Sequence, residues 1–266
     1  ERGITMIDLT SDKIRTDVIR SNFFNEDKLF FEKLNITRKS YTSPLGLHIY
    51  LRELSDGYYY AKEKDEDKIC NEIVGRYLCN KIGLETTDLE LLLDDDKLKI
   101  VTPNYRKQNL KYQCQKDDAD KLFRHQYDIR RLSILPKAYQ KEQFKLISID
   151  MMMEQWDRSG KNMEEVVIDG KLHLTPVIDF ENSFLYNKYF IYDNPYVSIP
   201  KDVENIDMFL NDFPEAYKYF LEIFDIEVEE LTECIESNYP IKVDNEVKEE
   251  YNRTISKNQK ILKAIR

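Results

Sequence analysis

The sequence predicts an α+β protein of two lobes, in which a small antiparallel-sheet N-lobe precedes a helical C-lobe. Strand and hairpin-turn signals gather in the first 103 residues of the 266-residue chain. From residue 104 onward, apolar residues recur mainly at helical spacing. Thr102-Pro103-Asn104 interrupts the pattern between these two parts. We therefore predict an N-terminal lobe of residues 1–103 and a C-terminal lobe of residues 104–266.

A hairpin gives the strongest local signal in the first lobe. Ser55-Asp56-Gly57 supplies its turn, because Asp-Gly pairs adopt the positive backbone dihedrals that tight hairpins require. Apolar positions at helical spacing follow, and Gly83 is suited to capping the C-terminus of that helix. The elements predicted in this lobe are helix 23–34, strands 47–51 and 58–62, helix 68–83, and strands 89–93 and 97–101.

The second lobe is predicted to be helical, with one embedded hairpin. Asp169-Gly170 marks the turn of that hairpin between strands 166–168 and 172–174. Helices are also predicted at 118–131 and 137–154. A thick apolar stripe indicates further helices and consists of Met208, Phe209, Phe213, Tyr217, Phe220, Leu221 and Phe224. A final amphipathic helix is marked by Val243, Val247, Tyr251 and Ile255.

Composition excludes several classes of function. The chain has 40 Lys and Arg against 50 Asp and Glu, a net charge of −10, and such a surface repels phosphate backbones. We therefore expect no general nucleic-acid binding. No apolar run approaches the ~18 residues of a spanning helix, so we expect no membrane insertion. The 4 cysteines form no Cys-x-x-Cys pair and the 3 histidines do not cluster, which argues against a zinc site and favours the reducing cytoplasm.

One segment of the second lobe carries residues suited to phosphoryl transfer. Asp157 is followed five residues later by Asn162, and Asp179 follows the embedded hairpin. A carboxylate on a loop can accept the proton of an attacking hydroxyl, and amide and carboxylate oxygens are the hard ligands that Mg²⁺ prefers. The hairpin should bring residues 162 and 179 together. We therefore predict Asp157 as the catalytic base, with Asn162 and Asp179 as metal ligands.

This pattern resembles the catalytic loop and metal-binding motif of the protein-kinase-like fold. It is most similar to the atypical HipA-like and phosphoinositide-kinase-like branch. The D-x-x-x-K-N loop of that family matches Asp157, Lys161 and Asn162, and its D-F-G motif matches Asp179-Phe180. Glu181 stands where the motif usually has glycine, and is expected to restrict the backbone there. The resemblance implies a two-lobed kinase-like fold, with ATP and Mg²⁺ as cofactors. Arg158 and Lys161 could be surface residues, but a cation beside the catalytic Asp can balance the charge of the transferred phosphate, and we assign that role to Lys161.

The resemblance also implies a lysine that contacts the ATP phosphates and is held by a glutamate on a helix. Lys62 ends a predicted strand, and Glu72 opens the helix that follows it. The run NEIVGRYLCNKIGL around Glu72 is similar to the corresponding helix of HipA-like proteins. Lys64 is the alternative lysine, since strand alternation places it on the same face as Lys62.

The segment expected to cover the phosphates lacks a glycine-rich loop. Residues 40–46 stand at the right place and contain a single glycine. Hydroxyl and backbone N–H groups of Ser40, Thr42 and Ser43 could instead cradle phosphate, with Ser43 as our chosen contact, and could also be sites of autophosphorylation. The connector near Thr102 would offer backbone groups to adenine.

The function that these residues indicate is ATP- and Mg²⁺-dependent phosphoryl transfer, by a HipA-like serine/threonine protein kinase. A protein acceptor is expected, since the acidic charge opposes anionic lipid surfaces. Two alternatives stay open. The missing glycine-rich loop and Glu181 would suit a pseudokinase or nucleotide-sensing interaction module. The same nucleotide site could also serve phosphorylation of a small molecule or transfer of AMP, because substrate choice depends on loops without motifs. The oligomeric state is not predicted.

Overall fold

The computed structural model describes residues 18–19, 39–42, 48–54, 57–63, 66–94, 97–103, 132–155, 158, 165–184, 203–239 and 241–265. For strands β1 to β4 it describes the backbone. The helices predicted at 23–34 and 118–131 lie outside the described residues.

The first lobe contains an antiparallel sheet of six strands. Their order is β1-β5-β6-β4-β3-β2, and both predicted hairpins are present, as β3 with β4 and β5 with β6. The strands are β1 (Val18–Ile19), β2 (Lys39–Thr42), β3 (His48–Leu54), β4 (Gly57–Glu63), β5 (Glu90–Asp94) and β6 (Lys97–Pro103). Strand β4 is therefore central, paired on one side with β3 and on the other with β6.

Strand β2 corrects one expectation. Residues 40–46 were predicted to cover a phosphate as a loop, whereas Ser40 and Thr42 lie in β2, opposite Tyr50 and His48 of β3. The pairing with β3 determines this strand, because the four residues Lys-Ser-Tyr-Thr carry little strand pattern of their own. Ser43, the chosen phosphate contact, lies outside the described residues.

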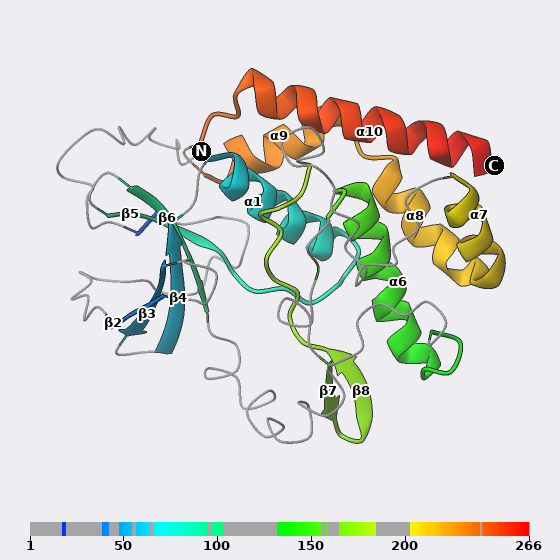
Figure 1. Cartoon of the computed structure of the whole chain (residues 1–266), viewed down its shortest axis with the longest axis horizontal. Helices are drawn as coiled ribbons and strands as arrows, with labels where there is room; N and C mark the ends of the chain where they lie inside the picture. Colours follow the sequence, from blue (N-terminus) through cyan, green and yellow to red (C-terminus); the bar gives the residue numbers. More distant parts are fainter. Residues whose placement is uncertain are drawn as a thin grey trace, which may run out of the picture.

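Helix α1 (Glu66–Lys81) follows β4 and lies between the sheet and the other helices (Figure 1). It begins with acidic residues and ends at Lys81, shortly before Gly83, whose φ of +64° suits a glycine cap; the helix predicted at 68–83 is thus confirmed. Every residue from 69 to 76 is buried, because α1 also contacts α6 and α9 of the second lobe. The helix therefore packs against the second lobe, although it belongs to the first along the chain.

The second lobe is largely helical. Its helices are α6 (Lys137–Met152), α7 (Val203–Asp212), the 3₁₀ turn η1 (Pro214–Ala216), α8 (Tyr217–Phe224), α9 (Val228–Glu236) and α10 (Asn245–Ile265). Phe209 packs its ring against Phe144, Phe213 and Phe220, so the predicted aromatic stripe forms core contacts. Met208 is an exception, with 58% of its surface exposed, because its position on α7 turns it away from that core.

The embedded hairpin consists of β7 (Glu165–Ile168) and β8 (Lys171–Leu174). Asp169 and Gly170 both have positive φ, as a tight two-residue turn requires, so this prediction is confirmed. Glu142 of α6 fixes the second strand, since its Oε2 accepts the Leu174 N–H at 2.6 Å and its Oε1 lies 2.9 Å from Nδ1 of His173. Figure 1 shows this hairpin beside one end of α6.

None of the helices in the described ranges combines the length and apolarity that a membrane span requires.

Candidate functional site

The segment from Val177 to Phe184 contains the predicted metal motif and connects the two lobes. At its start, Val177 donates its N–H to the Glu85 carbonyl at 2.9 Å, and the Thr86 hydroxyl donates to the Val177 carbonyl at 2.6 Å. At its end, the N–H of Phe184 donates to the Met153 carbonyl at 2.8 Å. The loop after α1 thus holds the start of the segment, and the end of α6 holds its end.

Asp179 occupies a left-handed backbone conformation, with φ of +68°. Non-glycine residues rarely adopt this region, and aspartate tolerates it better than most. Gln155 holds the conformation, because its Nε2 donates to the Asp179 carbonyl at 2.7 Å. The Ser183 hydroxyl donates to Oε1 of Gln155 at 2.9 Å, so one buried side chain joins both ends of the motif. Such local strain is typical of functional segments that surrounding contacts hold in place.

Phe180 fixes the motif against α1. Its ring is fully buried, and a Cβ built on Gly75 would lie 2.1 Å from its Cγ. On another side the guanidinium carbon of Arg158 lies 4.6 Å from the ring centroid, at a distance typical of a cation–π contact. Gly75 is therefore required by close packing, since any side chain there would displace the ring next to Asp179.

Arg158 joins the predicted catalytic loop to the metal motif. Its side chain is fully buried and pairs with Asp150 of α6, with Nη2 2.9 Å from Oδ1 and Nε 3.0 Å from Oδ2. Its Nη1 also donates to the Ile178 carbonyl at 2.5 Å. Arg158, which follows Asp157, is thus hydrogen-bonded to Ile178, which precedes Asp179. Sequence reasoning allowed Arg158 to be a surface residue, and the structure corrects this.

Three carboxylates gather where the motif meets α1. Carboxylate oxygens of Glu72, Asp179 and Glu181 all lie within 4.8 Å of one another. Glu72 and Glu181 are buried, with 2% and 8% of their surfaces exposed. Glu72 also pairs with Arg76, whose Nε donates to the Thr87 carbonyl at 3.1 Å. Oxygen-only donors of this kind suit a hard divalent cation such as Mg²⁺.

The predicted site residues divide into three groups. Glu72 and Asp179 lie close together, a neighbourhood that the sequence did not predict. Lys62 lies in central strand β4, its backbone between Ile49 and Ile100, and Thr102 lies half-buried in β6. The others lie outside the described residues and stay predictions: Ser43, Lys64, Asp157, Lys161 and Asn162.

Sequence reasoning missed the side chains that hold the motif. Asn71 donates through Nδ2 to the carbonyls of Glu181, at 3.2 Å, and Ser183, at 2.7 Å. Arg76 could have been found, since a glutamate four residues before an arginine on a helix commonly forms an ion pair. No comparable signal marks Asn71, because its partners lie more than a hundred residues away.

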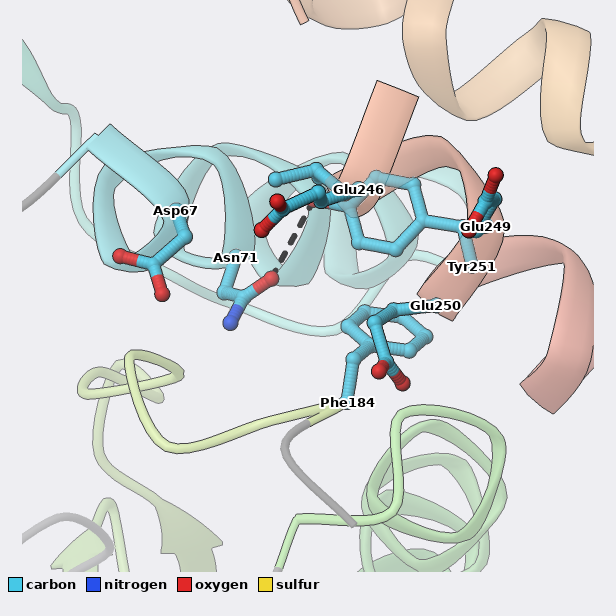
Figure 2. Close-up of a pocket in the computed structure, with 8 residues that line it drawn as sticks. Asp67, Asn71, Phe184, Glu246, Glu249, Glu250 and Tyr251 are labelled. Atoms are coloured by element: carbon cyan, nitrogen blue, oxygen red, sulfur yellow. Dashed lines mark hydrogen bonds between the residues drawn. The ribbon is translucent and has the colours of Figure 1, made fainter. Parts of the chain in front are cut away.

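A pocket of about 330 Å³ lies beside this segment, between α1 and the start of α10 (Figure 2). The rings of Phe184 and Tyr251 lie 4.6 Å apart there, and the Tyr251 hydroxyl donates to Oδ1 of Asn71 at 3.2 Å. Burial raises the pKa of Tyr251 well above its ordinary value, so the hydroxyl stays a donor. Four carboxylates line the pocket, from Asp67, Glu246, Glu249 and Glu250.

Comparison with known proteins identifies the fold. No protein-family model matches the sequence, and no curated protein sequence matches it. Solved structures do match. HipA of Shewanella oneidensis MR-1, from a toxin–antitoxin complex with HipB and operator DNA, aligns with a TM-score of 0.56 at 12% identity over 77% of this chain. The proinflammatory kinase CtkA of Helicobacter pylori aligns with a TM-score of 0.54 at 12% identity over 85% of this chain.

These likenesses establish a HipA-like, kinase-like fold with a small sheet lobe and a helical lobe, as the sequence predicted. The alignment covers 94% of the CtkA chain. This chain spans only 58% of the length of the HipA chain. Because the sequence identity is 12% in both comparisons, they establish the fold and nothing finer.

Proposed function

We propose that this protein is an ATP- and Mg²⁺-dependent phosphotransferase. The observation that carries the proposal is the carboxylate cluster, in which buried Glu72 of the first lobe meets half-buried Asp179 of the second within a kinase-like fold. Kinase-like folds catalyse by positioning ATP and neutralising phosphate charge, and they need hard oxygen ligands at this junction.

Each predicted residue has a defined task in this proposal. Asp179 and Asn162 hold Mg²⁺, which when bound neutralises charge on the phosphates. Asp157 accepts the proton of the attacking hydroxyl, and Lys161 balances charge beside it. The Arg158 contact to the Ile178 carbonyl supports this arrangement, since it links the two loops that carry these residues.

The first lobe would position the nucleotide. Lys62, with Lys64 as the alternative, aligns the phosphates, Ser43 contacts them, and the backbone at Thr102 contacts adenine. Glu72 orients the lysine in the family, whereas the partner that the described residues give it here is Arg76. This ion pair is the observation that favours the second candidate, a pseudokinase or nucleotide-sensing module. A glutamate that is paired with Arg76 is less able to orient the lysine that contacts the phosphates.

The acceptor that we propose is a serine or threonine hydroxyl of a protein. The overall likeness to CtkA, a kinase by its description, supports a kinase over other uses of the fold. A net charge of −10 argues against general nucleic-acid binding and against docking on anionic lipid. The described cysteines Cys70, Cys79 and Cys234 are free thiols, which suits the cytoplasm that we propose as its location.

The test is incubation with Mg²⁺ and γ-labelled ATP, followed by mass spectrometry of the protein and of added protein acceptors. We expect phosphate transfer that Asp157→Ala and Asp179→Ala each abolish, with the circular dichroism spectrum unchanged. Asp212→Ala removes an exposed carboxylate from the end of α7 and is the matched control. Full transfer by both site variants would refute the assigned roles.

Further readouts separate the alternatives. Lys62→Ala should impair transfer more than Lys64→Ala, and the reverse result would exchange their roles. An adenylyl mass shift in place of phosphate would identify AMP transfer, and label on an added small molecule would identify a small acceptor. Thermal stabilisation by nucleotide with no transfer would identify the pseudokinase.

A further inference from the structure

We propose that Glu154 is a positioning residue of the metal motif, through which helix α10 fixes the turn that carries Gln155. Gln155 bonds the carbonyl of Asp179, which the proposed function makes a metal ligand. The inference therefore rests on the proposed function and deepens it, because it names a residue outside the motif that sets the place of that ligand. It depends on how the end of α6 is built.

The turn that ends α6 is a Schellman motif with glutamate in place of glycine. The N–H of Glu154 donates to the Met151 carbonyl at 3.2 Å, and the N–H of Gln155 donates to the Asp150 carbonyl at 2.8 Å. Glu154 occupies the left-handed position of this motif, with φ of +51°, where glycine is usual and a side chain carries a steric cost. Contacts of the glutamate side chain must therefore offset that cost.

Helix α10 supplies these contacts. Nζ of Lys257 lies 2.6 Å from Oε1 of Glu154, and Nη2 of Arg253 lies 3.1 Å from Oε2. The hydroxyl of Thr254 donates to the same Oε2 at 3.2 Å. The Glu154 side chain is only 12% exposed, so water screens its ion pairs less than it would at the surface. Two cations and a hydroxyl group of α10 thus converge on one carboxylate at the end of α6.

The carbonyl groups of the same turn are bonded on two sides. The Met152 carbonyl accepts Nδ2 of Asn258 in α10 at 3.0 Å, and the Met153 carbonyl accepts the N–H of Phe184, at the end of the motif segment, at 2.8 Å. The last carbonyls of a helix lack partners within the helix, so they are available to bind other elements. The end of α6 thus lies between α10 and the motif and is bonded to both.

Gln155 follows Glu154 directly and connects the turn to the motif. Its side chain is buried, donates to the Asp179 carbonyl at 2.7 Å and accepts from the Ser183 hydroxyl at 2.9 Å. Both bonds depend on where the turn places the Gln155 backbone. If the turn is no longer held against α10, Gln155 can shift and holds Asp179 less firmly. Asp179 has a positive φ, so contacts of this kind maintain its conformation.

Hydrogen exchange measured by mass spectrometry on the full chain tests this connection without requiring activity. The variant is Glu154→Gly, which removes the carboxylate and places at the left-handed position the residue that favours it. Any effect then comes from the lost α10 contacts and not from a strained turn. We expect segment 177–184 to exchange about tenfold faster than in wild type, since its Phe184 N–H is bonded to the loosened turn.

Two further variants bracket this result. Lys257→Met removes one of the two cations that pair with Glu154, and should raise exchange of segment 177–184 by a smaller factor. Lys248→Met is the matched control, because it breaks a different ion pair of α10, with Glu236 of α9 at 3.6 Å. It should leave exchange of segment 177–184 as in wild type.

The Mg²⁺ dependence of phosphate transfer gives the second readout. We expect the Mg²⁺ concentration for half-maximal transfer to rise about tenfold in Glu154→Gly, because Asp179 is held less firmly as a metal ligand. The maximal rate at saturating Mg²⁺ should change less. A variant that is only less folded would lose maximal rate and keep the half-saturating Mg²⁺ concentration of wild type.

Thermal unfolding checks that each variant is folded. If Glu154→Gly does not fold, Glu154→Gln keeps the length of the side chain and removes its charge, and it should change exchange in the same direction. Exchange of segment 177–184 at the wild-type rate in the folded variant would overturn the inference, as would faster exchange confined to α10. An unchanged half-saturating Mg²⁺ concentration in an active variant would overturn it as well.

These outcomes are distinguishable from failure of the proposed function, because exchange is measured without ATP. Faster exchange of segment 177–184 in Glu154→Gly, with no transfer by wild type under any condition, would support positioning by Glu154 and refute the phosphotransferase. Transfer by wild type, with exchange and Mg²⁺ dependence that ignore Glu154, would leave the phosphotransferase standing and remove Glu154 from this role.

Discussion

Replacing Gly75 by alanine tests the packing that orients the metal motif. Gly75 lies in the interior of α1, where alanine normally stabilises a helix by about 0.8–1.0 kcal/mol. Here the new methyl group would stand 2.1 Å from Cγ and 2.5 Å from both Cδ atoms of Phe180. Ordinary carbon contacts are about 3.5–4.0 Å, so the ring or the helix must move by more than 1 Å.

The expected loss of stability in Gly75→Ala follows from how little room the Phe180 ring has. Phe180 is fully buried and also lies on the guanidinium of Arg158, so it has no open side to move into. Overpacking of this kind costs about 1–3 kcal/mol, occasionally more, which exceeds the gain in helix propensity. After the gain in helix propensity is subtracted, we expect a net loss of up to about 2 kcal/mol, and each kcal/mol lowers Tm by about 2–4 °C in a chain of this size.

The assay compares thermal unfolding and phosphate transfer in Gly75→Ala with those in Asn80→Ala. Asn80 is exposed on the same helix, so its replacement tests helix propensity without a clash and should slightly raise Tm. We also expect Gly75→Ala to reduce transfer more than its Tm explains, because the displaced ring adjoins Asp179. A Gly75→Ala protein as stable as Asn80→Ala, with full activity, would refute the placement of Phe180 against α1.

Three other predictions follow from described contacts. Arg158→Met removes the guanidinium bound to buried Asp150 and should lower the free energy of unfolding by about 3–5 kcal/mol in urea titration; a loss under about 1 kcal/mol would contradict the buried pair. Burial raises the pKa of Cys70 and Cys79 to about 12, so at pH 8 only about 0.01% is thiolate. Iodoacetamide should modify neither in the native chain at pH 8 and both in urea, as mass spectrometry of peptides would show; native labelling would contradict the packing of α1. Gly170→Ala introduces a side chain at φ of +72° with open space around it, and should cost about 1–2 kcal/mol in thermal unfolding while leaving phosphate transfer unchanged.

Local signals predicted most of the described elements. The turn at Asp169-Gly170 depends on two adjacent residues that accept positive φ, so a short window of sequence determines it. Helix α1 was likewise predicted, because its apolar spacing and Gly83 cap are local. The strand at 39–42 was missed, since its partner β3 and not its own pattern determines it. Met208 was misplaced because helical spacing alone did not show which of two adjacent residues faces the core.

The site was predicted unevenly for a related reason. Asp179 and Glu72 were chosen through motifs, in which residue type and spacing carry the information. The contacts of Gln155 and Asn71 depend on which carbonyl groups the finished fold leaves nearby, and no spacing rule encodes that. Arg158 was judged by its charge, which favours the surface, whereas a buried carboxylate on α6 provides its partner.

The position of α1 therefore controls the geometry of the cluster. Asp179 and Phe184 both hold positive φ values without being glycine, at a cost of order 1–3 kcal/mol each, so the surrounding contacts must maintain them. Asn71 bonds the turn between them, and Glu72 meets the carboxylate of Asp179 directly. A shift of α1 would loosen these contacts together and separate the three carboxylates.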